Sequence, residues 1–236
     1  MQHNNVFFSS ADVDRYREKL KTDPAARARY EKYTQTVEKD LSEPYASWEE
    51  ANDSDTQGRN FGVLHSQADR LSVSLGLKYL VEGDLRCAER LKGLLAHFIA
   101  FPRWYGVSYS TRKPVPWHSD LYSTAATLSF GRIYDLIFDT LTPAERGDLA
   151  QGILGKGVLP AFSDWVLPQK RIHALDSMGH NWWAACIGEA ATALLAIKDH
   201  LPAGQGDELP RVRGPRACGV SDVSGQPAVQ QIPELR

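Results

Sequence analysis

The sequence contains few cysteines and no cluster of metal-binding residues. Its three cysteines, Cys87, Cys186 and Cys218, form no C-x-x-C pair and stand apart from the histidines. An odd and scattered set of this kind excludes a disulfide framework and a zinc site of the usual ligand spacing. We therefore expect buried or free thiols, no metal and no other cofactor.

An excess of charge of one sign is also missing. The 236 residues include 27 basic and 29 acidic side chains, mixed along the chain, for a formal net charge of −2. This balance gives no electrostatic reason to expect nucleic acid or an anionic membrane surface as a partner.

Long apolar runs are absent as well. A membrane-spanning helix needs about 18 or more apolar residues, and the nearest stretch, 184–197, contains Glu189. The first residues lack the basic start and apolar run of a signal peptide. As written, the chain is expected to be soluble and to stay in the cytoplasm.

Aromatic residues are missing from the last part of the chain. Residues 201–236 contain five prolines and five glycines but no Phe, Trp or Tyr, whereas all 23 aromatic residues precede them. We expect a domain over 1–200 followed by a Pro/Gly-rich tail. Two interpretations of the tail stay open: a disordered segment, or a shift of reading frame near codon 200.

Helical periodicity dominates what is present, and alternation typical of strands is nearly absent. The pattern predicts an all-α protein built from helical hairpins, packed as a solenoid or a closed toroid. The expected helices cover 11–22, 24–41, 63–81, 85–100, 121–140, 143 to about 155, 159–166 and 180–199.

Capping residues mark several of these helix starts. Asp23 precedes Pro24, and Thr142-Pro143-Ala144-Glu145 is a capping box with proline at the first helical position. Asp84 caps the helix after a very short turn at Glu82-Gly83. The polar segment 42–62 and the aromatic segment 102–116 are expected to be long loops.

The most informative stretch is His180-Asn181-Trp182-Trp183, at the start of an apolar helix. Tryptophan offers a flat face to a sugar ring, while Asn and His supply hydrogen bonds and a proton carrier. The stretch indicates a carbohydrate site. Tryptophans at this position also serve as core residues, and Asn181 as an ordinary N-terminal capping residue.

A second group of candidates surrounds the helix expected to start near 121. Trp117 and His118 precede it, together with Asp120, which we interpret mainly as an acid of the first turn. The aromatic loop before it offers a sugar-stacking wall or a lid, with Trp104, Tyr105 and Tyr109. Glu189 lies two turns beyond Trp182 on the same side, and His65 is a further general candidate.

Four segments of the chain are informative together: Val6-Phe7-Phe8-Ser9-Ser10-Ala11-Asp12-Val13, Leu77-Lys78-Tyr79-Leu80-Val81-Glu82-Gly83-Asp84, Tyr134-Asp135-Leu136-Ile137-Phe138-Asp139-Thr140-Leu141-Thr142 and Gly179-His180-Asn181-Trp182-Trp183. They resemble the N-terminal helical domain of the heparinase II/III-like polysaccharide lyases, which include oligoalginate lyases. Their order and spacing extend over 6–199.

The resemblance implies an incomplete α/α toroid, normally followed by a β-sandwich domain. That domain, and the downstream helical segment with the family's catalytic tyrosine, are not in this sequence, so we expect an incomplete lyase domain, with an inactive domain as the alternative. Family members are usually periplasmic or secreted.

The activity implied by the resemblance is β-elimination of a uronic-acid-containing polysaccharide. Asn181 then neutralises the substrate carboxylate, and His180 binds substrate or acts as a base. The residues expected to contact the substrate are Trp182, Trp117, His118, Trp104, Tyr105 and Glu189. Two alternatives stay open: a non-catalytic carbohydrate-binding fragment, and a glycoside hydrolase, which needs two carboxylates facing one cleft.

Overall fold

The computed structural model describes residues 6–52, 62–105, 118–166 and 181–201, and none of these forms a β-strand. The all-α prediction is therefore confirmed. The helices are α1 (Ser10–Thr22), α2 (Pro24–Thr34), α3 (Val37–Ser42), α4 (Trp48–Ala51), α5 (Gly62–Glu82), α6 (Leu85–Ile99), α8 (Leu121–Ile137), α9 (Pro143–Ile153), α10 (Leu159–Trp165) and α12 (Asn181–Ile197). None of these helices is long and apolar enough to cross a membrane.

The predicted helix caps form as expected. Ser9, Asp23, Asp84 and Thr142 each accept a hydrogen bond from a backbone N–H in the first turn that follows. Gly83 has a φ of 74°, in the left-handed region that glycine adopts without strain. This residue allows α5 to turn directly into α6, as the short Glu82-Gly83 turn predicts.

Two predicted boundaries are wrong. The helix expected over 24–41 is divided between α2 and α3. Asp40 of α3 pairs with Arg70 of α5 and accepts from Ser74 Oγ at 2.6 Å. These contacts hold α3 against α5, in a direction that a continuous helix would not follow. The helix after Thr142 does not stop at Gly155. It continues through a π-helical turn over Leu154–Val158 into α10.

Three long helices, α5, α8 and α12, form a layer of parallel neighbours. Gly62 and Gly76 of α5 face Tyr122 and Leu136 of α8, so the two helices advance in the same direction. Thr124 and Gly131 of α8 meet Glu189 and Ala193 of α12 in the same order. The N-termini of these three helices therefore lie at one end of the layer.

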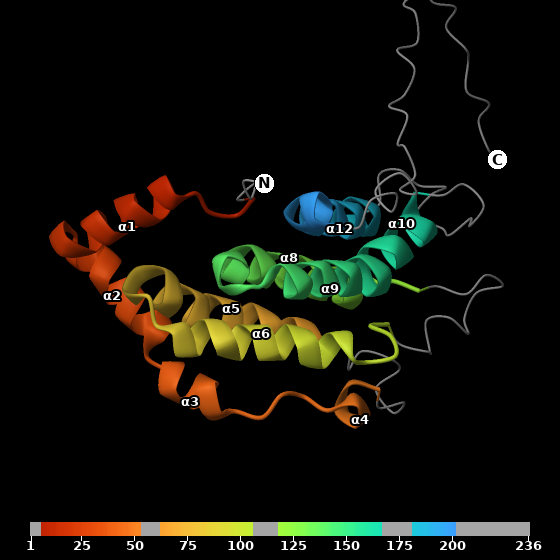
Figure 1. Cartoon of the computed structure of the whole chain (residues 1–236), viewed down its shortest axis with the longest axis horizontal. Helices are drawn as coiled ribbons and strands as arrows, with labels where there is room; N and C mark the ends of the chain where they lie inside the picture. Colours follow the sequence, from red (N-terminus) through yellow and green to blue (C-terminus); the bar gives the residue numbers. More distant parts are fainter. Residues whose placement is uncertain (1–5, 53–61, 106–117, 167–180, 202–236) are drawn as a thin grey trace, which may run out of the picture.

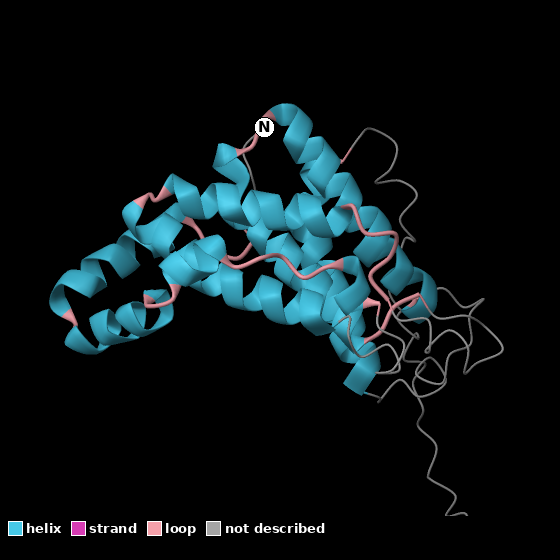
Figure 2. Ribbon diagram, turned by 90° about the horizontal axis from the view of Figure 1, so that it is seen from below, coloured by secondary structure: helices cyan, strands magenta, loops and turns pink. Residues whose placement is uncertain are grey.

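The connecting helices return in the opposite direction and cover one side of this layer. In Figure 1, α5 with α6 and α8 with α9 lie in successive rows, and α12 follows as the next. Helices α1 and α2 extend from the other end of the rows, where α5 and α8 finish (Figures 1 and 2).

Buried aromatic side chains pack between α6 and α8. They are Phe98 of α6, Trp104 in the segment after α6, and Phe130 of α8, and all three are completely buried. The Trp104 and Phe130 ring centroids lie 4.6 Å apart. Trp165, at the end of α10, is also fully buried. These large side chains fix the spacing of the helices near the end where α5, α8 and α12 begin.

Candidate functional site

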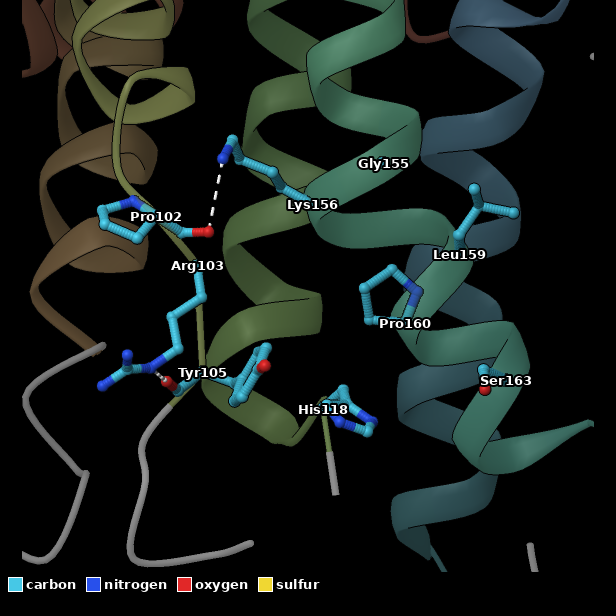
Figure 3. Close-up of a pocket in the computed structure, with 9 residues that line it drawn as sticks. All are labelled: Pro102, Arg103, Tyr105, His118, Gly155, Lys156, Leu159, Pro160 and Ser163. Atoms are coloured by element: carbon cyan, nitrogen blue, oxygen red, sulfur yellow. Dashed lines mark hydrogen bonds between the residues drawn. The ribbon is translucent and has the colours of Figure 1, made fainter. Parts of the chain in front are cut away.

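A pocket of about 420 Å³ opens between the segment after α6 and the π-helical turn that leads into α10. Figure 3 shows its lining, which is Pro102, Arg103, Tyr105, His118, Gly155, Lys156, Leu159, Pro160 and Ser163. π-Helical turns are rare and are found frequently at functional sites. Here the turn places Lys156 at the edge of the pocket.

Two predicted sugar contacts, Tyr105 and His118, meet in this pocket. Their rings pack edge to face, with centroids 5.3 Å apart. Asp164 of α10 holds His118 from behind: its carboxylate accepts from the His118 backbone N–H at 2.5 Å and lies 3.6 Å from Nδ1. The imidazole is thus fixed at the pocket wall beside an aromatic face.

Two cations of the pocket have no carboxylate partner among the described residues. Lys156 Nζ donates to the carbonyl oxygens of Phe101 and Pro102. Arg103 donates to the Tyr105 carbonyl oxygen and to the side chain of Asn52. These carbonyl and amide oxygens do not neutralise the positive charges, so the described lining of the pocket carries a local excess of positive charge.

The predicted role of Trp104 is wrong. Its side chain is completely buried against Phe130, and its Nε1 donates to the carbonyl oxygen of Phe98 at 2.8 Å. Neighbouring residues of this aromatic segment therefore have different roles. Trp104 packs in the core at the end of α6, and Tyr105 lines the pocket.

Asn181 is the first residue of α12 and is exposed. Trp182, a predicted substrate contact, and Trp183 are both half-buried, and both contact Trp165. The Trp182 ring centroid lies 6.4 Å from that of Trp165, and Trp183 Nε1 donates to the Trp165 carbonyl oxygen at 3.1 Å. The end of α10 thus anchors the start of α12 and holds Asn181 at the surface.

Glu189 of α12 and His65 of α5 each contact a side chain of α8. Thr124 Oγ1 donates to Glu189 Oε2 at 2.6 Å, and burial raises the pKa of this half-buried carboxyl. His65 Nδ1 lies 3.3 Å from Ser129 Oγ. Both side chains are partly exposed.

Asp120 is the N-cap of α8 rather than an acid of its first turn. It is buried, and one carboxylate oxygen accepts from the backbone N–H groups of Tyr122 and Ser123 at 2.9 Å. Its Oδ2 has no hydrogen-bond partner in the described part of the chain. Burial raises the pKa of Asp120 to about 6.

His180, Trp117 and Tyr109 lie outside the described residues. Sequence reasoning missed three residues of the pocket region: Arg103, Lys156 and Asp164. The isolated Lys156 between two glycines was a usable signal, because it interrupts a helical pattern. No pattern marks Asp164. In the described part of the chain, no group of three or more His, Cys, Asp or Glu residues is arranged to hold a metal ion.

Comparison of the chain with protein-family models, with curated proteins and with solved structures gave no match.

Proposed function

We propose that this chain is the helical domain of a polysaccharide lyase that cleaves a uronic-acid-containing polysaccharide by β-elimination. The architecture proposed with it is an incomplete α/α toroid, in which α5, α8 and α12 form the inner layer and α6 and α9 the outer one. The sequence resemblance to the heparinase II/III-like lyases supports both statements.

The observation that carries the proposal is the convergence of three helix N-termini at the end where Asn181 is exposed. Each helix N-terminus bears about half a positive charge, which attracts anions, and at α8 the buried Asp120 already caps two of the backbone N–H groups. Three parallel helices bring these partial charges to the same end of the layer. An acidic sugar bound near Asn181 is favoured by these partial charges, although Asp120 offsets the charge of α8.

The chemistry of β-elimination needs such a field. Removal of the proton at C5 of a uronate places a second negative charge on the carboxylate side of the sugar, and fixed donors that face this charge lower the barrier. The Asn181 amide donates hydrogen bonds to the carboxylate without adding a group that titrates. Anchoring of α12 by Trp165 keeps this donor in a fixed place.

The pocket supports an acidic ligand independently of the helix ends. Lys156 and Arg103 supply charges that pair with no carboxylate in the described part of the chain. Tyr105 and His118 supply a ring surface and a hydrogen-bonding group. A sugar ring combines an apolar face with a hydroxylated rim, which suits such a wall. We assign this pocket to a sugar unit of the bound chain.

One experiment separates this function from the two alternatives. The purified chain is incubated with alginate, heparan sulfate and other uronans, and both the absorbance of unsaturated uronate and the release of reducing ends are followed. Unsaturated product supports the lyase. Binding without product supports a non-catalytic carbohydrate-binding domain, and reducing ends without unsaturation indicate a glycoside hydrolase.

A further inference from the structure

We propose that Glu189 and His65 form an acid–base pair that transfers the protons of the elimination reaction across the surface of α8. The inference rests on the proposed lyase function and deepens it by naming the proton-transferring groups. It places both groups on helices within the described part of the chain.

The two side chains contact neighbouring turns of α8, Glu189 from α12 and His65 from α5. Tyr122 of α8 packs against Gly62 of α5, so Ala125 and His65, each three residues further on, also correspond. Thr124, next to Ala125, holds Glu189 from the other side. Glu189 thus meets α8 at Thr124 and His65 meets it at Ser129; Ala125 lies between these two contacts in the sequence, and we call Glu189, Ala125 and His65 the row across α8.

The middle of this row is small and open. Ala125 is partly exposed and carries only a methyl group, as the floor between the two functional side chains. Helices in contact have axes about 8–10 Å apart, so α5 and α12 are separated by roughly twice that distance across α8. A sugar ring bound over Ala125 has a carboxyl group on one side and an imidazole on the other.

Hydrogen bonds determine which nitrogen of His65 is reactive. Ser129 Oγ donates its only proton to the Ala125 carbonyl oxygen at 3.0 Å, so it accepts from His65 Nδ1–H. His65 Nε2 is then the nitrogen that gains and loses the transferred proton. Ser129 thus fixes both the tautomer and the orientation of the ring.

Thr124 adapts to both protonation states of Glu189. Its hydroxyl lies 2.6 Å from Glu189 Oε2 and 3.0 Å from the Asp120 carbonyl oxygen. It donates to the ionised carboxylate, or accepts from the protonated carboxyl while donating to that carbonyl oxygen. The hydrogen bonds are therefore satisfied before and after proton transfer.

The proposed step conserves atoms and electrons. The Glu189 carboxylate takes the C5 proton, and the electrons of the C5–H bond form the C4=C5 double bond. The C4–O bond breaks, and its electron pair stays on the leaving oxygen, which takes the proton from His65 Nε2. Exchange with water then moves a proton from Glu189 back to His65.

Other charged groups surround the pair. Asp120 is buried at the start of α8, and burial raises the pKa of Cys186, one turn before Glu189, to about 12. Arg132 of α8 pairs with Asp69 of α5 at 2.5 Å, one turn beyond His65. Asp69 makes a matched control, because its side chain carries a carboxylate on the same helix but is paired.

The test uses the pH dependence of kcat/KM for unsaturated product. The wild type should show a bell, because Glu189 must be ionised and His65 protonated. Glu189→Gln and His65→Gln should each lower kcat/KM by about 10²- to 10⁴-fold. The residual activity should lose the acid limb in the first variant and the alkaline limb in the second, whereas Asp69→Asn should keep both limbs. If Glu189→Gln and His65→Gln both retain both limbs of the pH profile, the proposed acid–base pair is refuted.

A binding measurement separates this inference from the lyase proposal. A saturated uronate tetrasaccharide is added to Asn181→Ala protein, and the imidazole resonances of His65 are followed by NMR. The pair requires that they shift, with no such change at His97, which bonds the Ala46 carbonyl oxygen. Unchanged His65 resonances would overturn the pair. Absence of unsaturated product from wild-type protein with every uronan would overturn the lyase proposal alone.

Discussion

Gly131 of α8 lies directly against Ala193 of α12, so closely that a Cβ added at Gly131 would be 2.8 Å from the Ala193 Cα. Backbone atoms cannot move aside as a flexible side chain can. This contact sets the distance between the two helices, and hence the position of Glu189 one turn earlier in α12.

Gly131→Ala should therefore destabilise the protein. Alanine favours a helix over glycine by about 1 kcal/mol, but overpacking a close helix contact costs about 1–3 kcal/mol. We expect a lower midpoint in urea unfolding. Gly147→Ala is the matched control: it lies inside α9 with no atom within 4 Å of the added Cβ, so it should raise stability. Equal gains in both variants would refute the close contact.

Asp120 predicts a pH dependence of stability. Burial raises its pKa in the folded state to about 6, above the ordinary aspartate value of 3.8. The folded state thus binds a proton more readily than the unfolded state, and this residue destabilises the fold above pH 6 and less so below it. Between pH 7 and pH 5, its contribution should become more favourable by about 1 kcal/mol.

The comparison is made with Asp120→Asn, which keeps an oxygen acceptor for the N-cap and does not titrate. Urea unfolding of both proteins at several pH values gives the difference in unfolding free energy. This difference should shift in favour of the wild type as the pH falls from 7 to 5. A difference independent of pH would contradict the raised pKa.

The fold was largely predictable because its signals are local. Ser9, Asp84 and Thr142 cap helices through contacts within one turn, so sequence patterns identify them. The break between α2 and α3 was missed because it depends on a pairing of Asp40 with Arg70, 30 residues away. The π-helical turn before α10 was likewise read as a helix end, since its glycines favour termination.

The candidate site was less predictable, because it depends on packing. The sequence predicts the same role for Trp104 and Tyr105, and only packing at the end of α6 distinguishes the buried Trp104 ring from the half-buried Tyr105 ring. Glu189 and His65 are 124 positions apart in the sequence. Their alignment follows from three helices that run parallel, which helical periodicity does not determine.

If substrate binds between Glu189 and His65, activity should depend on the size of the side chain at position 125. Ala125→Leu should fill the space between Glu189 and His65 and lower kcat/KM for a uronan at least tenfold, while both functional groups remain. Helix propensity barely changes, since leucine is close to alanine. Ala144→Leu, on the exposed first turn of α9, is the control and should retain full activity. Full activity of Ala125→Leu would place the substrate elsewhere.

The charge of Lys156 should make the pocket bind acidic ligands more tightly than neutral ones. Lys156→Met should weaken binding of a uronate oligosaccharide several-fold, as expected for loss of about 1 kcal/mol from one charge-assisted contact, and leave binding of a neutral oligosaccharide unchanged. Calorimetric titration at two salt concentrations measures both. Lys92→Met should have little effect, because Lys92 already pairs with Glu89 and Glu145. Equal weakening for neutral and acidic ligands would argue against an anion site.

The most direct test of the lyase proposal is the absorbance of unsaturated uronate after incubation with a panel of uronans, for the wild type and for Asn181→Ala. We expect unsaturated product from the wild type with at least one uronan. We expect the product to be lost in Asn181→Ala, with the helical circular dichroism spectrum unchanged. Unchanged turnover in the variant would contradict the role of Asn181, and absence of product from the wild type with every uronan would contradict the lyase itself.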